Sequence, residues 1–171
     1  FRTAYLEIAR KNGKSTMAAG VALYLLDGDR EGGAEVYSAA TKRDQAKIVH
    51  GEASRMVRSS PSLRSFITVH RDNIHVVDTN SKFEPLSSDF NSLDGLNIHG
   101  AIVDEVHAHK TRDLWDVLDT ATGARRQPLI FGITTAGVSR LSVCRELHDY
   151  TEKILENSLA DDSFCGVIYT L

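Results

Sequence analysis

The chain has 171 residues, of which 42% are hydrophobic and 25% are charged, and its net charge is −3. These values predict one globular domain with a packed core and exclude wholesale disorder. No apolar run approaches the roughly 20 residues of a membrane span, and two cysteines are too few for a disulfide scaffold, which favours a reducing, cytoplasmic setting.

Predicted strands and helices alternate along the chain. In order, we expect a strand over 4–9, a helix ending near Leu26, a strand over 34–40, a helix from Thr41 to about Arg58 with Thr41 as its cap, β-hairpins over 66–86, a strand over 97–105, a helix over 111–122, a strand over 128–135, a helix over 138–159 and a strand over 164–170. Near-continuous apolar strands that alternate with helices predict an α/β fold whose mainly parallel sheet is covered on both faces.

The stretch "ARKNGKST", residues 9–16, joins the first predicted strand to the first helix. It ends in Gly13-Lys14-Ser15 like a phosphate-binding loop, although Ile8 stands where the usual pattern has its first glycine. In such a loop Gly13 lets the backbone approach the phosphates, Lys14 reaches the β- and γ-phosphates, and the Ser15 hydroxyl ligates Mg²⁺. Taken alone, the motif fits an ordinary strand–loop–helix junction equally well.

Two later strand ends carry residues suited to nucleotide hydrolysis. "AIVDEVHAH", residues 101–109, delivers Asp104 for a Mg²⁺ shell and Glu105 as a general base, which is typical of a Walker B element. "FGITTAG", residues 131–137, ends in Thr134 and Thr135, which could contact a γ-phosphate or the attacking water. A strand that merely ends at solvent is the simpler explanation of either segment by itself.

Histidines and basic residues suggest further sites. His107 and His109 lack a third ligand at convincing spacing for zinc, so we expect them to order the loop after Glu105. The single tryptophan, Trp115, is expected in the core. Residues 41–71 hold seven basic side chains against two acids, so this segment could follow DNA phosphates or form a solvated helix face. The DNA-contact candidates are Lys42, Arg43 and Lys47.

In their order along the chain, "ARKNGKST", "LDGLNIHGAIVDEVHAHK" and "FGITTAG" closely resemble the ATPase domain of the large terminase subunit of tailed bacteriophages. The resemblance covers nearly the whole chain. It implies a three-layer P-loop NTPase of the additional-strand, catalytic-glutamate (RecA-like) type over residues 1–171, in which the strand with Thr134 lies between the P-loop strand and the Asp104 strand. The implied function is ATP hydrolysis that powers translocation of double-stranded DNA into the procapsid.

The resemblance also assigns residues, a cofactor and partners. Terminase loops lack the first glycine and carry an arginine before Gly-Lys, so Arg10 would stabilise charge on the phosphates. The implied ATP-binding loop is Ala9, Arg10, Lys11, Asn12, Gly13, Lys14, Ser15 and Thr16. Mg²⁺ with ATP would be held by Ser15 and Asp104. Implied partners are double-stranded DNA, a portal protein, a small terminase subunit and further copies in a ring, with no membrane, in the host bacterial cytoplasm and transiently at the procapsid portal.

Some features of the family are absent or altered. An adenine-contacting segment would precede Phe1 and a nuclease domain would follow Leu171, so we expect no nuclease activity here. Leu93-Asp94-Gly95 stands where many terminases have Arg-Gly, so a trans-acting arginine would come from elsewhere. The guesses for it are Arg125, Arg126 and Arg140. Alternative functions are a helicase-like or other DNA-remodelling P-loop ATPase, which would need two RecA-like lobes, and a scaffold without turnover.

Overall fold

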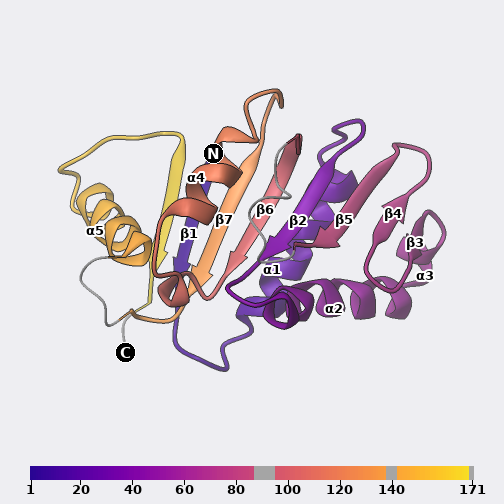
Figure 1. Cartoon of the computed structure of the whole chain (residues 1–171), viewed down its shortest axis with the longest axis horizontal. Helices are drawn as coiled ribbons and strands as arrows, with labels where there is room; N and C mark the ends of the chain where they lie inside the picture. The colour runs from indigo at the N-terminus through magenta and orange to yellow at the C-terminus, as the bar shows by residue number, and fades with distance from the viewer. Residues whose placement is uncertain (87–94, 138–141, 170–171) are drawn as a thin grey trace.

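The protein has three layers, with a central sheet between two layers of helices (Figure 1). The computed structural model describes residues 1–86, 95–137 and 142–169. Its strands are β1 (Thr3–Glu7), β2 (Glu35–Ala39), β3 (Ile67–Val69), β4 (Ile74–Val76), β5 (Ser81–Pro85), β6 (Ile98–Asp104), β7 (Leu129–Thr134) and β8 (Phe164–Ile168). Its α-helices are α1 (Lys14–Leu23), α2 (Arg43–Ser59), α3 (Pro61–Arg64), α4 (Asp113–Thr120) and α5 (Val143–Leu155).

The described strands form one sheet in the order β3, β4, β5, β2, β6, β7, β1, β8. In this spatial order, every pair of neighbouring strands from β5 through β2, β6, β7 and β1 to β8 is parallel. Strands β3, β4 and β5 form an antiparallel meander. The predicted α/β class and the hairpins over 66–86 are therefore confirmed, and β5 also joins the main sheet beside β2. The placement of β7 between β6 and β1, which the family resemblance implied, is confirmed as well.

Helices α1 and α2 cover one face of the sheet, and α4 and α5 cover the other (Figure 1). Because successive side chains of a strand point to opposite faces, Ile102 of β6 packs with α1 while Val103 packs in the second core. Trp115 of α4 lies in this second core, as predicted. It approaches β7 at Gly132, where an added Cβ would lie 3.2 Å from the indole ring, so a glycine is needed at this contact.

Several predicted helix boundaries differ from the structure, and the helix predicted over 111–122 spans Asp113–Thr120. Helix α1 ends at Leu23 and continues as a π-helical turn over Tyr24–Gly28, beyond the predicted end. Helix α5 begins after Ser142, whose hydroxyl accepts from the Arg145 N–H, and ends at Leu155. The first predicted residues of that helix, 138–141, lie outside the described residues.

The predicted cap of α2 is wrong. Lys42, in an extended conformation, occupies the N-cap position, and no side chain among the described residues caps this helix. The Thr41 hydroxyl donates instead to the Gln45 side chain at 3.0 Å. A capping oxygen must sit on the residue that directly precedes the helix, and Thr41 lies one residue too early. None of the described helices is long and apolar enough to cross a membrane.

Candidate functional site

The candidate site lies where the adjacent strands β1, β7 and β6 end. Glu7, the last residue of β1, pairs with Thr134 of β7, and Asp104 of β6 pairs with Ile133. Parallel strands in this register bring their following loops to one edge, where open α/β sheets bind ligands. The structure thus brings the predicted loop at residues 9–16, the acids of β6 and the threonines of β7 to the same edge, although they are far apart in sequence.

The loop at residues 9–16 has the backbone of a tight turn. Gly13 precedes α1 with φ of 73°, and Lys11 has φ of 66°, so both adopt the left-handed conformation. The Asn12 side-chain amide donates to the carbonyls of Ala9 and Arg10, at 3.1 and 3.3 Å. The loop therefore stabilises its own shape, and the Arg10 side chain stays exposed at its outer side.

Lys14 differs from the exposed Arg10 and Lys11 of this loop because its side chain points inward. It is only 9% exposed, and its Nζ donates to the carbonyl oxygen of Ile8 at 3.5 Å. No side chain in the described part of the chain caps the first turn of α1, so its N–H groups remain available to an anion. Ser15 is half-buried and Thr16 is exposed in the same turn.

Asp104 is buried and lies close to other charges of the site. Burial is the main cause that raises the pKa of its carboxyl, and Glu105 raises it further. The Glu105 N–H, which donates to Asp104 Oδ1 at 2.8 Å, and the Lys14 ammonium act in the opposite direction. A buried carboxylate beside a second acid is a strong position for a cation, because a positive charge would relieve both effects.

Glu105 has an unusual backbone. Its φ of 52° and ψ of 50° place it in the left-handed region, which costs a non-glycine residue about 1–2 kcal/mol. Such strain occurs preferentially at functional sites, where it aims a side chain. The Glu105 carboxylate is half-buried, and its Oε2 lies 3.1 Å from His107 Nδ1.

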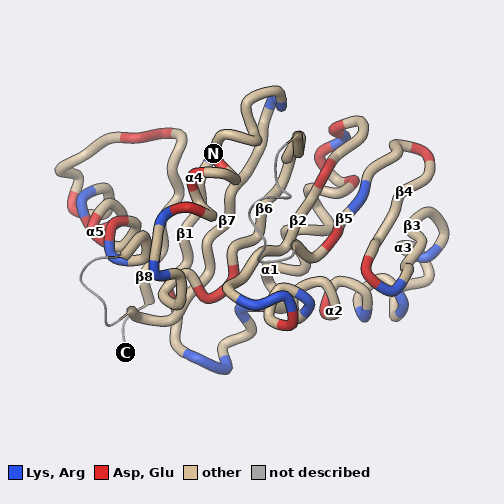
Figure 2. Tube along the Cα trace, viewed as in Figure 1, with Lys and Arg blue, Asp and Glu red and all other residues tan. Residues whose placement is uncertain are grey.

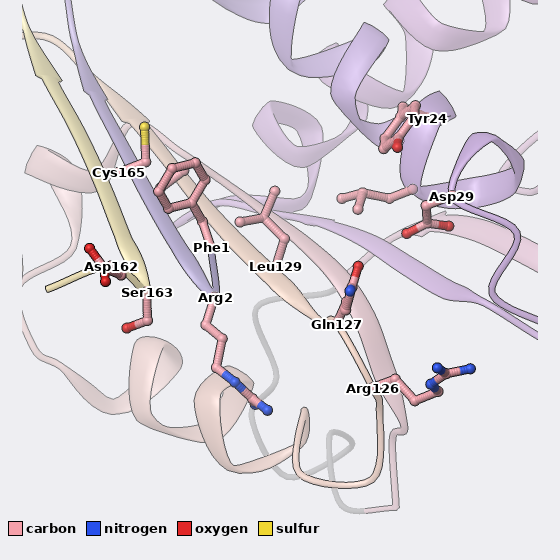
Figure 3. A pocket seen from close by; sticks show the side chains of 12 residues that line it. Phe1, Arg2, Tyr24, Asp29, Arg126, Gln127, Leu129, Asp162, Ser163 and Cys165 are labelled. Carbon is pink, nitrogen blue, oxygen red and sulfur yellow. The ribbon is translucent and has the colours of Figure 1, made fainter.

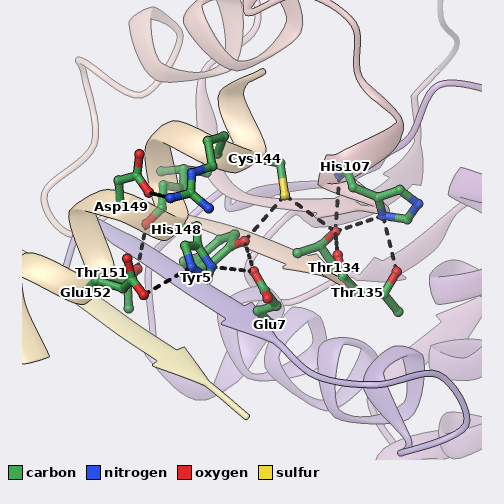
Figure 4. A network of polar contacts seen from close by, with 12 residues as sticks. Tyr5, Glu7, His107, Thr134, Thr135, Cys144, His148, Asp149, Thr151 and Glu152 are labelled. Atoms are coloured by element: carbon green, nitrogen blue, oxygen red, sulfur yellow. Dashed lines mark hydrogen bonds and ion pairs between the residues drawn. The ribbon is translucent and has the colours of Figure 1, made fainter. Parts of the chain in front are cut away.

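Thr134 is fully buried, and its hydroxyl faces other protein groups (Figure 4). The hydroxyl donates to the Thr135 carbonyl at 2.9 Å and accepts from the His107 N–H at 3.1 Å. His107 Nδ1 lies 2.9 Å from the same oxygen. The expected role of His107 in ordering this loop agrees with these contacts. Of the two threonines, the half-buried Thr135 is the more accessible to a ligand.

A second polar network, which sequence reasoning missed, adjoins Thr134 (Figure 4). The buried Glu7 accepts from the Tyr5 hydroxyl at 2.8 Å and lies 2.9 Å from His148 Nδ1 of α5. Tyr5 also lies 3.4 Å from Cys144 Sγ, and the Cys144 thiol reaches Thr134 Oγ1 at 4.0 Å. A glutamate two residues after a tyrosine in an apolar strand was the only sequence signal.

A cavity of about 740 Å³ lies at the opposite edge of the sheet (Figure 3). Its lining includes Arg2 and Leu129, which lie at the beginnings of β1 and β7, and Tyr24 at the end of α1. Because the predicted site residues follow the ends of the same strands, this cavity is not the candidate nucleotide site.

The predicted DNA-contact residues lie at the start of α2, near the loop at residues 9–16. Figure 2 shows the basic segments of this loop and of α2 along the same lower side of the molecule. Two of the candidates are partly neutralised, because Lys47 Nζ and Arg43 Nη2 lie 3.0 and 3.7 Å from the Asp72 carboxylate. Lys47 is the main cause that lowers the pKa of Asp72. Lys42 is exposed at the helix start.

The guesses for a trans-acting arginine find little support. The Arg125 guanidinium donates to the carbonyls of Asn97 and Gly33, at 3.0 and 2.6 Å, and its side chain is 8% exposed. It therefore joins the loops at the far edge of the sheet, which is inconsistent with reaching another subunit. Arg126 lines the cavity at that edge, and Arg140 lies outside the described residues.

The Gly-Lys-Ser loop follows β1, the Asp-Glu pair follows β6, and β7 lies between these two strands. This arrangement defines a P-loop ATPase with an additional strand between the two motifs. The family described as "Terminase large subunit, ATPase domain" matches residues 1–153, and the chain belongs to this family. The membership favours the terminase over the helicase-like alternative.

Known proteins agree with this assignment. The large terminase subunit of Enterobacteria phage HK97 is 32% identical over 137 residues, which are 77% of this chain and 27% of that protein. The crystal structure of the HK97 large terminase matches 98% of this chain and 35% of that chain, with a TM-score of 0.82 and 27% identity. The large terminase of a thermophilic bacteriophage, solved in complex with ADP, shares the fold at a TM-score of 0.69 and 15% identity, over 99% of this chain and 40% of that chain. This chain thus spans about a quarter to two fifths of these relatives.

Proposed function

We propose that this chain is the ATP-hydrolysing motor domain of a phage terminase large subunit, and that it powers translocation of double-stranded DNA into the procapsid. The observation that carries the proposal is the meeting of the Gly13-Lys14-Ser15 turn and the Asp104-Glu105 pair at one edge, on either side of β7. Membership of the terminase family and the ADP bound to the relative from the thermophilic phage support it.

The loop would bind ATP through backbone N–H groups and side chains. Residues 9–16 would surround the phosphates, with Lys14 at the β- and γ-phosphates and Arg10 as a charge stabiliser from the loop. The uncapped first turn of α1 supports this role, because its free N–H groups favour an anion. Thr135, and Thr134 through its contacts, would sense the γ-phosphate and couple hydrolysis to movement of the DNA.

The residues present fit a magnesium ion. Mg²⁺ prefers oxygen ligands, and the Ser15 hydroxyl and the buried Asp104 carboxylate offer them at the same edge of the sheet. Bound there with ATP, the ion would neutralise charge that develops on the phosphates. Glu105 would take the proton from the attacking water as general base, and its strained backbone supports an aimed carboxylate.

Partners and setting follow from the same proposal. The domain would act in a homo-oligomeric ring with a portal protein and a small terminase subunit, in the host bacterial cytoplasm and transiently at the procapsid portal. Lys42, Arg43 and Lys47 would contact DNA phosphates, and Lys42 is the candidate without a described acidic partner. Neutralising Lys42 should then weaken DNA binding and reduce the salt dependence of binding. Unchanged binding would mean that Lys42 is a solvated surface residue that does not contact DNA.

The test of the proposed chemistry compares Glu105→Gln with Lys14→Ala. Glu105→Gln should bind ATP normally and lose about 10²–10⁴-fold in turnover, because only the proton acceptor is removed. Lys14→Ala should weaken nucleotide binding itself. Glu146→Gln is a matched control, since this carboxylate is exposed on α5 and pairs with Arg112. Unchanged turnover in Glu105→Gln would remove Glu105 from its role, and turnover indifferent to double-stranded DNA and procapsids would contradict the motor function.

A further inference from the structure

We propose that His107 is a positioning residue for Glu105 and that it links this carboxylate to Thr134. The inference rests on the proposed function, because it assigns a partner to the general base of ATP hydrolysis. It starts from one oxygen of Glu105. Oε2 is buried and forms no hydrogen bond of good geometry within the described part of the chain. His107 Nδ1 lies 3.1 Å away and is the ring nitrogen that faces it.

The contacts of Thr134 favour the tautomer of His107 in which Nδ1 carries the proton. The Thr134 hydroxyl uses its single hydrogen toward the Thr135 carbonyl at 2.9 Å. Its oxygen can then only accept from His107, whose backbone N–H lies at 3.1 Å and whose Nδ1 lies at 2.9 Å. We therefore assign the hydrogen to Nδ1, which lies within reach of Thr134 Oγ1, of Glu105 Oε2 and, at 3.5 Å, of Thr135 Oγ1. In this assignment one N–H bonds the sensor threonine and needs only a small rotation to reach the carboxylate.

Packing keeps the imidazole in this orientation. Gly137, in the loop after β7, lies against the base of this side chain, because an added Cβ would lie 3.3 Å from His107 Cβ and 3.2 Å from Cys144 Sγ. The two bonds from His107 to one threonine oxygen restrict the ring further. When Nδ1–H turns toward the adjacent Oε2, the other carboxylate oxygen of Glu105 is left to accept a proton from water. A displacement of Thr134 would move His107 and, with it, the base.

The proposal predicts a specific split in the kinetics. His107→Ala should lower kcat by about 10²-fold, the order expected when a catalytic group is misplaced by about 1 Å, while KM and the affinity for ADP stay unchanged. His107→Asn should restore most of the loss, because its amide nitrogen takes the place of Nδ1. His107→Gln should not, because its longer side chain puts the amide nitrogen near the place of Nε2. His75→Ala, in β4 at the far end of the sheet, is the control for loss of a half-buried histidine.

A double-mutant cycle tests the link to Thr134. Thr134→Val keeps the shape and removes the hydroxyl, so His107→Ala combined with Thr134→Val should be no slower than His107→Ala alone. Steady-state ATP turnover and the affinity for a fluorescent ADP analogue are measured for each variant. If His107→Ala fails to fold, the comparison of His107→Asn with His107→Gln takes its place.

Glu105→Gln separates this proposal from the proposed function. If Glu105→Gln is inactive while His107→Ala and His107→Gln turn over like the wild type, the positioning role is overturned and the general base stands. Additive losses in the double mutant, or a loss in His107→Ala that appears in KM and ADP affinity, would also overturn it. Full turnover in Glu105→Gln would instead remove Glu105 as the general base, and with it the part of the proposed function on which this inference rests.

Discussion

Two tyrosine–glutamate pairs in the same sheet, on strands separated by β6 and β7, offer a test of how the burial of the acceptor sets the strength of a hydrogen bond. Tyr5 donates to Glu7 at 2.8 Å in β1, and Tyr37 donates to Glu35 at 2.7 Å in β2. Both tyrosines are 1% exposed. Each glutamate lies two residues from its tyrosine, after Tyr5 in one pair and before Tyr37 in the other. Burial raises the pKa of each hydroxyl well above the ordinary tyrosine value, so both donate at neutral pH.

The two acids differ in their access to water. The Glu7 side chain is 8% exposed and retains only His148 Nδ1 among the described side chains once the tyrosine hydroxyl is removed, whereas Glu35 is 26% exposed and lies near Lys82. A hydrogen bond to a charged group contributes about 1.5–3 kcal/mol when the charge cannot be rehydrated. Tyr5→Phe should therefore lower the free energy of unfolding by about 2–3 kcal/mol, and Tyr37→Phe by about 1 kcal/mol or less.

Urea unfolding at pH 7, followed by circular dichroism, measures both changes. The midpoint should fall more in Tyr5→Phe, with the slope of each transition equal to that of the wild type. A loss in Tyr37→Phe as large as that in Tyr5→Phe would refute the reasoning, because both tyrosines are 1% exposed and Tyr5→Phe in addition removes the contact with Cys144 Sγ. It would mean that solvent access of the acceptor does not control the energy of the pair.

Two further predictions concern the candidate site itself. Gly13→Ala should lower the free energy of unfolding by about 1–2 kcal/mol through the left-handed backbone alone, since no described residue other than its two chain neighbours has an atom within 4 Å of an added Cβ. An unchanged urea midpoint would contradict this conformation. Asp104→Asn should stabilise the nucleotide-free protein at pH 7 in chelator. Because the pKa of Asp104 is raised in the folded state, this group favours folding while it is protonated. Its contribution to the free energy of unfolding is fully present below about pH 3.9, the pKa in the unfolded state, and is lost as pH rises through the pKa in the folded state. Each pKa unit that separates the folded from the unfolded state corresponds to about 1.4 kcal/mol. The advantage over the wild type should vanish in unfolding measurements at pH 3, and a variant less stable than the wild type at pH 7 would show that Asp104 is not penalised by burial.

The sequence predicts the alternating elements well because their apolar patterns are local. The strand over residues 98–104 is buried along its entire length and reads as one apolar run before two acids. The position of β7 between β1 and β6 was different in kind: it followed from the resemblance to a family and not from any pattern of residues. Pairing of distant strands has no local signal.

The errors and omissions also arise from distant contacts. The partner of Lys47 is Asp72, which the β3–β4 turn brings to α2 and which no spacing along the chain reveals. No pattern near Glu7 indicates its partner, because His148 lies 141 residues away. The cap of α2 failed for a local reason, since a shift of one residue at a helix start is within the accuracy of any pattern.

The central position of β7 has a consequence for synthesis on the ribosome. The segments that would hold the phosphates are made first and the acids of β6 follow, but the strand that spaces them ends only at residue 134. Until that strand emerges, β1 and β6 lack their shared neighbour, so an unfinished polypeptide cannot assemble the proposed triphosphate site. Ribosome-bound chains of increasing length should acquire nucleotide affinity only after this strand has left the exit tunnel, which would keep unfinished chains from binding ATP.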